Sequence, residues 1–416
     1  MNNQKHFEDF TGTNGQEDIF NKIIALDDFL EKTPPECTHG LGINILGAAD
    51  HLTEIQDDNG HHHNVVMLGS NSFLTLTKHP KVINAVKNAC DKYGYGTGAV
   101  SLYAGITDLH KELEARIADL YGKEDAILFP CGYSGNIGVI SALCGKGDVI
   151  INDAANHASI FDGCVLSSAD IKIYLHANMK HLEKILKNIP TTTKGRLIIT
   201  DGVFSMDGDT APLDQITELA KKYNARIMVD EAHGIGIVGP TGRGTPEKYN
   251  CAQDIDIIFG TLSKAPGGIG GYCAGSKQLI RYLRYYARTY FFSTSIPTPI
   301  VAGLIEVIKL IADHKTGHIK LWKNINYMLT RLKALGFNTG KTESAIIPII
   351  VGDEDLLGKF NNELRHAGIM TNVVTYPAVR RKECRLRLNI MDSLTQEDMD
   401  RSLLALETIG KRYGII

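Results

Sequence analysis

The sequence predicts an α/β protein in which a large domain with a mostly parallel sheet follows an N-terminal arm and precedes a smaller C-terminal α/β domain. From residue 109 to residue 230, short apolar runs alternate with segments of helical spacing. This rhythm is typical of βαβ units, whose helices cover both faces of a sheet. The chain of 416 residues also exceeds one typical domain. We expect an arm and hairpin over 1–64, a large domain over 65–298 and a small domain over 299–416.

The first part of the chain predicts an arm, a helix and a hairpin. Residues 1–17 are polar and contain glycines, which favours a loose arm, and a helix is expected over 18–32. Residues 52–68 indicate a hairpin, because the run Asp57-Asp58-Asn59-Gly60 is typical of a tight turn. His61-His62-His63 follows this turn. Consecutive strand residues point to opposite faces and cannot all bind one ion, so we predict no metal site.

The middle and end of the chain predict the two sheets. Apolar runs that read as buried strands lie at 126–129, 149–152, 196–200, 225–230 and 255–259. Helices are expected at 109–120, from 131–136 onward, at 213–223 and after Pro299. In the small domain, strands are expected at 345–351 and 385–390 and a closing helix at 395–412.

Composition excludes several functional classes. A net charge of -3 and a charged fraction of 22% give no indication of a nucleic acid or an acidic membrane as partner. The eight cysteines form no C-x-x-C pair, which favours reduced thiols in a cytoplasmic protein. No apolar stretch has the length of a signal peptide or a membrane span. We therefore predict a cytoplasmic protein without an integral membrane segment.

Lys264 and Asp230 are the first candidates for chemistry. Each follows a predicted parallel strand, where ligands bind in an open α/β sheet. Lys264 lies in a segment with five glycines among the twelve positions 260–271, so few side chains fill the space beside it. A buried amine that loses its proton can condense with an aldehyde, while a carboxylate can pair with a protonated ring nitrogen. Pyridoxal phosphate needs both groups, and we expect it as the cofactor.

Several motifs together resemble the α-oxoamine synthases, enzymes that use pyridoxal phosphate to join an amino acid to an acyl-CoA with loss of carbon dioxide. The likeness extends from about Val65 to the C-terminus. Its motifs are Asn156-His157-Ala158-Ser159, Thr200 to Asp209, Asp230-Glu231-Ala232-His233, Gly260-Thr261-Leu262-Ser263-Lys264 and Arg385-Leu386-Arg387. The resemblance implies an aminotransferase-like fold of type I and a homodimer with shared active sites.

The resemblance also implies roles for individual residues. The cofactor phosphate would be held by the backbone at Gly132 and Tyr133, where a helix follows a strand, and by the Thr261 hydroxyl. His157 would stack on the cofactor ring. His233, and less closely Ser205, match residues that bond to the phenolic oxygen, and Asp230 would keep the ring nitrogen protonated. Ser293 and Thr294 match residues that reach the phosphate of the neighbouring subunit.

The substrate contacts implied by the resemblance are Arg387 and Asn71. Arg387 would hold the carboxylate of the amino acid, and Arg385 would lie on the same strand face. The alternative for both arginines is a pair of solvated charges on an exposed strand. Two segments depart from the family. Ser101 stands where many members have an arginine. Arg380-Arg381-Lys382 stands where members usually have small residues, and this basic segment could contact the phosphates of CoA or form a solvated loop.

The substrate pair stays open between three members of the family. Likeness of residues 67–74 favours a serine palmitoyltransferase-like reaction, with 2-amino-3-ketobutyrate CoA ligase (glycine C-acetyltransferase) and 8-amino-7-oxononanoate synthase as alternatives. An ordinary aminotransferase would have no acyl-CoA site. A cofactor-free scaffold subunit is the alternative outside enzymology, and the presence of Lys264 argues against it.

Overall fold

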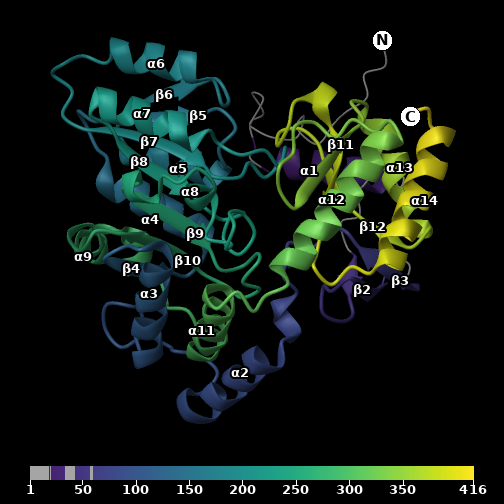
Figure 1. Ribbon diagram of the computed structural model, residues 1–416, viewed down its shortest axis with the longest axis horizontal. Coiled ribbons are helices and arrows are strands. Elements are labelled where there is room, and N and C mark those ends of the chain that lie inside the picture. Colours follow the sequence, from purple (N-terminus) through teal and green to yellow (C-terminus); the bar gives the residue numbers. More distant parts are fainter. Residues whose placement is uncertain (1–17, 19, 33–42, 57–59) are drawn as a thin grey trace.

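The computed structural model describes residues 18, 20–32, 43–56 and 60–416. The predicted arm over 1–17 and the turn residues 57–59 lie outside this range. The chain forms two lobes, one built around a large sheet and one that combines the described N-terminal strands with the C-terminal elements (Figure 1). Across the described residues, no helix is long and apolar enough to cross a membrane.

The large sheet has the strand order β4-β10-β9-β8-β7-β5-β6. All of its strands run parallel except β10, which is antiparallel to both of its neighbours. The strands are β4 Asp125–Phe129, β5 Val149–Asp153, β6 Asp170–Tyr174, β7 Arg196–Asp201, β8 Arg226–Asp230, β9 Ile257–Thr261 and β10 Gly271–Gly275. Side chains in β5, β9 and β10 are buried throughout, as expected for a sheet covered on both faces. The mostly parallel sheet and the aminotransferase-like fold are confirmed.

Helices cover both faces of this sheet and form two hydrophobic cores. One face packs against α4, α5, α9 and α10, while the core of the other face continues into the second lobe. The helices of this lobe are α2 Pro80–Tyr93, α3 Asp108–Tyr121, α4 Gly132–Leu143, α5 Ala158–Ser167, α6 Met179–Asn188, α7 Leu213–Tyr223, α8 Thr245–Lys248, α9 Lys277–Tyr286, α10 Arg288–Phe291 and α11 Thr298–Ala312. Pro297 directly precedes helix α11, and Pro299 lies in its first turn. The helix packs against α2 and α3 below the sheet (Figure 1).

The second lobe combines the N-terminal hairpin with the C-terminal elements (Figure 1). Its first sheet has the order β1-β2-β3-β12 and its second the order β11-β14-β13. The strands are β1 Asn44–Ile45, β2 Leu52–Gln56, β3 His62–Met67, β11 Ile346–Ile350, β12 Ile369–Met370, β13 Asn372–Val374 and β14 Arg385–Asn389. Its helices are α1 Asn21–Lys32, α12 His318–Ala334, α13 Glu354–His366 and α14 Gln396–Arg412. Strand β12 pairs in parallel with β3, so the predicted hairpin joins a C-terminal strand in one sheet.

Candidate active site

The predicted site residues of the large lobe converge at the carboxyl ends of the parallel strands. Asp201 and Asp230 end the neighbouring strands β7 and β8 and are paired in register. Lys264 follows the end of β9, and His157 lies between β5 and α5. These side chains line one cavity together with Gly132 and His233, and we call it the Lys264 cavity. Topology thus brings together residues that are scattered over the sequence.

The Lys264 amine is held by a histidine. Its Nζ donates to His233 Nε2 over 2.7 Å, which assigns the ring proton of His233 to Nδ1. That Nδ1 atom is buried and has no hydrogen-bond partner among the described residues. Burial lowers the pKa of Lys264 to about 8, although Asp230 opposes this shift. Burial, followed by the charge of Lys264, also holds the pKa of His233 well below its ordinary value, so this imidazole is neutral.

A chain of hydrogen bonds links Asp230 to His157. Asn136 donates one amide hydrogen to Asp230 Oδ2 over 2.8 Å and the other to Ser159 Oγ over 2.9 Å. The Ser159 hydroxyl lies 2.8 Å from His157 Nδ1, and the Ser159 backbone N–H also donates to that nitrogen. His157 Nδ1 is therefore an acceptor, and the ring proton is left on Nε2. Burial lowers the pKa of His157, which favours the neutral ring.

The opposite end of the Lys264 cavity is formed by the start of α4. The first N–H groups of a helix have no partners within the helix and favour an anion. A Cβ atom on Gly132 would lie 3.0 Å from both Cβ and Oγ1 of Thr261, so glycine allows the helix start to approach β9. The Tyr133 ring meets the His157 ring edge-on, with centroids 6.1 Å apart. These residues can hold a phosphate beside a ring that lies against His157.

Arg387 extends from the small lobe toward this cavity. Its Nη2 donates to Asn71 Oδ1 over 3.1 Å, while its Nε is buried without a hydrogen-bond partner among the described residues. Burial lowers the pKa of Arg387 to about 10. Arg385 on the same strand is only 2% exposed and donates from Nη1 to Asp207 Oδ1 over 2.6 Å. The interpretation of both arginines as solvated surface charges is therefore wrong.

The remaining predicted residues divide into two groups. Ser205 lines the Lys264 cavity. Ser293 and Thr294 do not line it within this chain, and Thr294 forms an isolated bridge with Val100. Ser101 is buried and also lies outside the cavity.

The Lys264 cavity fits pyridoxal phosphate. The helix start with Gly132 and Thr261 suits the phosphate, and the carboxylate of Asp230 suits a protonated ring nitrogen. The unpartnered Nδ1 of His233 offers a donor to a cofactor oxygen. Lys264 supplies the amine that can bond to the aldehyde. These groups occupy one cavity and would otherwise leave buried donors unpaired, which is costly.

Sequence reasoning did not assign Asn136, Ser159 or Asp201 to the site. Asp201 could have been found, because it ends a predicted strand in the same way as Asp230. Burial and the neighbouring charge of Asp230 raise the pKa of Asp201 well above its ordinary value. Ser159 lies in a quoted motif and Asn136 in the predicted helix start over 131–136, but no local pattern indicates that an amide on α4 bridges a strand end and a second helix.

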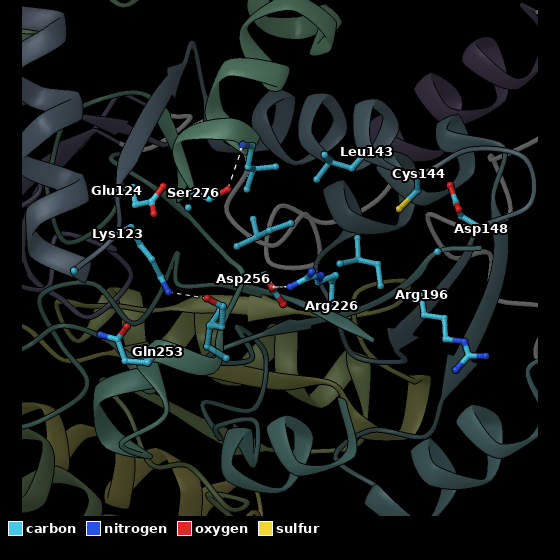
Figure 2. Close-up of a pocket in the computed structure, with 17 residues that line it drawn as sticks. Lys123, Glu124, Leu143, Cys144, Asp148, Arg196, Arg226, Gln253, Asp256 and Ser276 are labelled. Atoms are coloured by element: carbon cyan, nitrogen blue, oxygen red, sulfur yellow. Dashed lines mark hydrogen bonds and ion pairs between the residues drawn. The ribbon is translucent and has the colours of Figure 1, made fainter. Parts of the chain in front are cut away.

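A larger cavity, of ≈ 680 Å³, lies at the amino ends of the strands (Figure 2). This amino-edge cavity is lined by Lys123, Cys144, Asp148, Arg196, Arg226 and Asp256, among others. Its charges are matched: Arg226 pairs with Asp256 over 2.6 Å, and Lys123 donates to the carbonyls of Ala252 and Ile255 (Figure 2). None of its lining side chains has an unpartnered buried polar atom. Volume alone therefore does not mark the reactive site.

Comparison with known proteins gives one family and relatives of several named activities. The description "aminotransferase class I and II" matches residues 63–406. The chain is 44% identical over 352 residues to an 8-amino-7-oxononanoate synthase of Thermoanaerobacter pseudethanolicus, which covers 85% of this chain and 89% of that protein.

Among solved structures, a serine palmitoyltransferase resembles this chain more than an 8-amino-7-oxononanoate synthase does. A serine palmitoyltransferase from S. paucimobilis, solved with a bound adduct of PLP and myriocin, matches with a TM-score of 0.89 and 32% identity, covering 95% of this chain and 98% of that chain. An 8-amino-7-oxononanoate synthase from Francisella tularensis matches with a TM-score of 0.72 and 26% identity, covering 84% of this chain and 98% of that chain.

Proposed function

The chain belongs to the aminotransferase class I and II family and, within it, to the α-oxoamine synthases that use pyridoxal phosphate, and we propose that it acts as an 8-amino-7-oxononanoate synthase. The observation that carries this choice is the 44% identity over 352 residues to a synthase of that name. The product name defines the two halves of the reaction. Alanine supplies the carbon that bears the amino group and its methyl group, and a seven-carbon acyl thioester with a terminal carboxylate supplies the rest.

The reaction makes one carbon–carbon bond and breaks the α-carbon–hydrogen bond, the carbon–sulfur bond and the bond to the carboxylate, and a proton is added to the α-carbon when carbon dioxide leaves. The α-carbon of the amino acid attacks the thioester carbonyl, the carbon–sulfur bond breaks to release CoA, and the former amino-acid carboxylate leaves as carbon dioxide. When bound, pyridoxal phosphate supplies an aldehyde for the amino group and a ring that accepts the electron pair of the α-carbon. The chain supplies binding, orientation and proton transfer.

Each residue near the cavity has a task that its environment supports. The Arg387 guanidinium, with a free Nε, orients the amino-acid carboxylate. Lys264, whose pKa is lowered to about 8, holds a substantial free-amine fraction near neutral pH and can accept the α-proton. Asp230 is held in place by Asn136 and by the Ala232 N–H, and its carboxylate would pair with the protonated ring nitrogen of the bound cofactor.

A second candidate is a serine palmitoyltransferase-like reaction, which the sequence analysis favoured. Two observations support it: the TM-score of 0.89 over 95% of the chain and the likeness of residues 67–74. Sequence identity to that structure is 32%, against 44% for the oxononanoate synthase. The two reactions share every residue described above and differ in the acyl donor and in the β-carbon of the amino acid.

Assembly and location belong to the same proposal. Ser293 and Thr294 lie outside the Lys264 cavity of their own chain, which supports a homodimer in which they reach the phosphate of the second subunit. We expect a cytoplasmic enzyme. Analytical ultracentrifugation tests the dimer.

Thiol release from purified protein loaded with pyridoxal phosphate tests the function. Alanine with heptanedioyl-CoA should give the highest kcat/KM, compared with serine and palmitoyl-CoA and with glycine and acetyl-CoA. Preference for serine and palmitoyl-CoA would move the assignment to the second candidate. Absence of thiol release with all three pairs would contradict the reaction class.

A further inference from the structure

A third cavity, of ≈ 540 Å³, adjoins the site through Arg387. It lies between strand β13, the end of α13 and the loop after β13, and its walls include Met206, Met370, Val373 and Pro377. We call it the Arg365 cavity, after the cation that lines it. Arg387, which bonds to Asn71, lines this cavity, so the space lies next to the contact expected for the amino-acid carboxylate.

Arg365 is a cation on the wall of this cavity, in the last turn of α13. Its side chain is half-buried, and the bond of its guanidinium within the protein runs from Nη2 to Asn362 Oδ1 over 2.7 Å. No carboxylate of the described residues forms an ion pair with it. Arg284 and Arg385 do have such partners, Glu114 and Asp207, whereas Arg387, which lines the same cavity, pairs with no carboxylate of the described residues either. Because a guanidinium carries five N–H donors, Arg365 has several left for a ligand.

The cavity around Arg365 has the composition of a chain-binding site with one charged end. Its walls combine two methionines, two valines and a proline with two asparagines and two threonines, and its two cations are Arg365 and Arg387, of which Arg387 is the one expected to hold the amino-acid carboxylate. Apolar walls favour methylene groups, and a planar guanidinium binds a carboxylate through two parallel bonds. A position in the last turn of α13 explains why a cation is tolerated there, but it does not explain why this cation faces a cavity.

We propose that Arg365 binds the distal carboxylate of the acyl donor and is the residue that selects this donor over one without the carboxylate. The inference rests on the proposed function and names the residue that would select its donor. A CoA phosphate is the competing anion. The exposed segment Arg380-Arg381-Lys382 suits a hydrated phosphate better, since Arg380 is 85% exposed.

Binding of two matched thioesters tests the inference without turnover. Heptanedioyl-CoA and heptanoyl-CoA differ in the distal carboxylate and share the CoA moiety. Calorimetric titration into the protein loaded with pyridoxal phosphate, with no amino acid present, should give a Kd about 10- to 100-fold lower for heptanedioyl-CoA. In Arg365→Leu this ratio should fall to about one through weaker binding of heptanedioyl-CoA alone.

Two further variants complete the test. Arg365→Lys keeps the charge and should retain part of the preference, whereas Arg401→Leu removes a neighbouring exposed guanidinium, which donates to Ala367 O, and should change neither Kd. Equal Kd values in the wild type, or a preference that survives in Arg365→Leu, would overturn the inference. Equal weakening of both thioesters in Arg365→Leu would assign Arg365 to CoA and also overturn it. Thiol release on addition of alanine is read separately and reports on the proposed function.

Discussion

The two edges of the large sheet carry similar residues and differ in how those residues are paired. The amino-edge cavity holds a lysine, arginines and aspartates, and its lysine and Arg226 are matched to carbonyls or a carboxylate (Figure 2). The Lys264 cavity holds a lysine, histidines and aspartates, and His233 Nδ1, Asn136 Oδ1 and Asp201 Oδ1 are left unpartnered among the described residues. Buried unpartnered groups also occur elsewhere in the described residues, but of these two cavities the Lys264 cavity has them and the amino-edge cavity does not, which fits a site completed by a bound group.

Replacing Lys264 and Lys123 by alanine, one at a time, should give the largest difference in activity between the two edges of the sheet. Lys264→Ala should lower turnover by about 10⁴-fold, because the amine that accepts the α-proton is lost. Borohydride should attach pyridoxal phosphate covalently to the wild type and not to this variant, as measured by mass spectrometry of tryptic peptides. Lys123→Ala, which removes a buried amine at the other edge, is the control and should retain attachment at Lys264. Attachment that persists in Lys264→Ala would contradict the assignment.

Replacement of an aspartate at each edge, Asp230 or Asp256, should give a smaller difference in reaction rate. Asp230→Asn should still bind the cofactor but slow exchange of the α-proton of alanine about 10²- to 10³-fold, since a neutral amide cannot keep the ring nitrogen protonated. The exchange is followed by NMR in deuterated water. Asp256→Asn at the amino-edge cavity should exchange at the wild-type rate. An unchanged rate in Asp230→Asn would remove its electrostatic role.

The pH dependence of stability tests the burial of Lys264. Its pKa in the folded protein is about 8, below the ordinary 10.5, so the unfolded chain binds more protons between these values. Stability contributed by this group therefore rises with pH across that window. Relative to Lys264→Met, the cofactor-free wild type should gain on the order of 2–3 kcal/mol from pH 8 to pH 10.5 in urea titrations. Parallel curves for the two proteins would mean that the amine is solvated.

The smallest effect on stability and turnover is expected at the amino-edge cavity. Arg226 is 79% exposed and pairs with Asp256, and exposed pairs of this kind contribute about 0.2–1 kcal/mol. Arg226→Ala should lower the free energy of unfolding by no more than this and leave turnover at the wild-type level. A loss of activity in this variant would show that the amino-edge cavity is coupled to the reaction, and the contrast between the edges would fail.

The sequence predicted most of the sheet and the residues at its reactive edge, because strands and strand ends leave local patterns. Apolar runs located β5, β7 and β8, and the residues that follow them include His157, Asp230 and His233. The antiparallel direction of β10 had no such signal, since five residues rich in glycine do not indicate a direction. The strand β9 also begins and ends two residues later than expected, at Ile257 and Thr261.

Contacts between side chains from distant segments could not be predicted from the sequence. Asn136 and Asp230 are separated by 94 residues, and the bond between them depends on the spacing of α4 and β8 in the folded sheet. Arg385 and Arg387 were correctly placed on one strand, yet their burial follows from Asp207 and Asn71 in other parts of the chain. Arg365 belongs to an ordinary amphipathic helix, and only the fold shows that it faces a cavity.

The pairing of β3 with β12 has a consequence for how this protein is made. Nearby Gly69 and Asn372, which also bond, are 303 residues apart, and ribosomes add about 5–20 residues per second. During synthesis the free edge of β3 is therefore exposed for about 15–60 s before its partner strand emerges. An unpaired strand edge is prone to join other chains. The residues that β12 later covers, Val66 and Met67, are apolar, and the polar residues His62, His63 and Asn64 directly before them limit the apolar length that another chain could join.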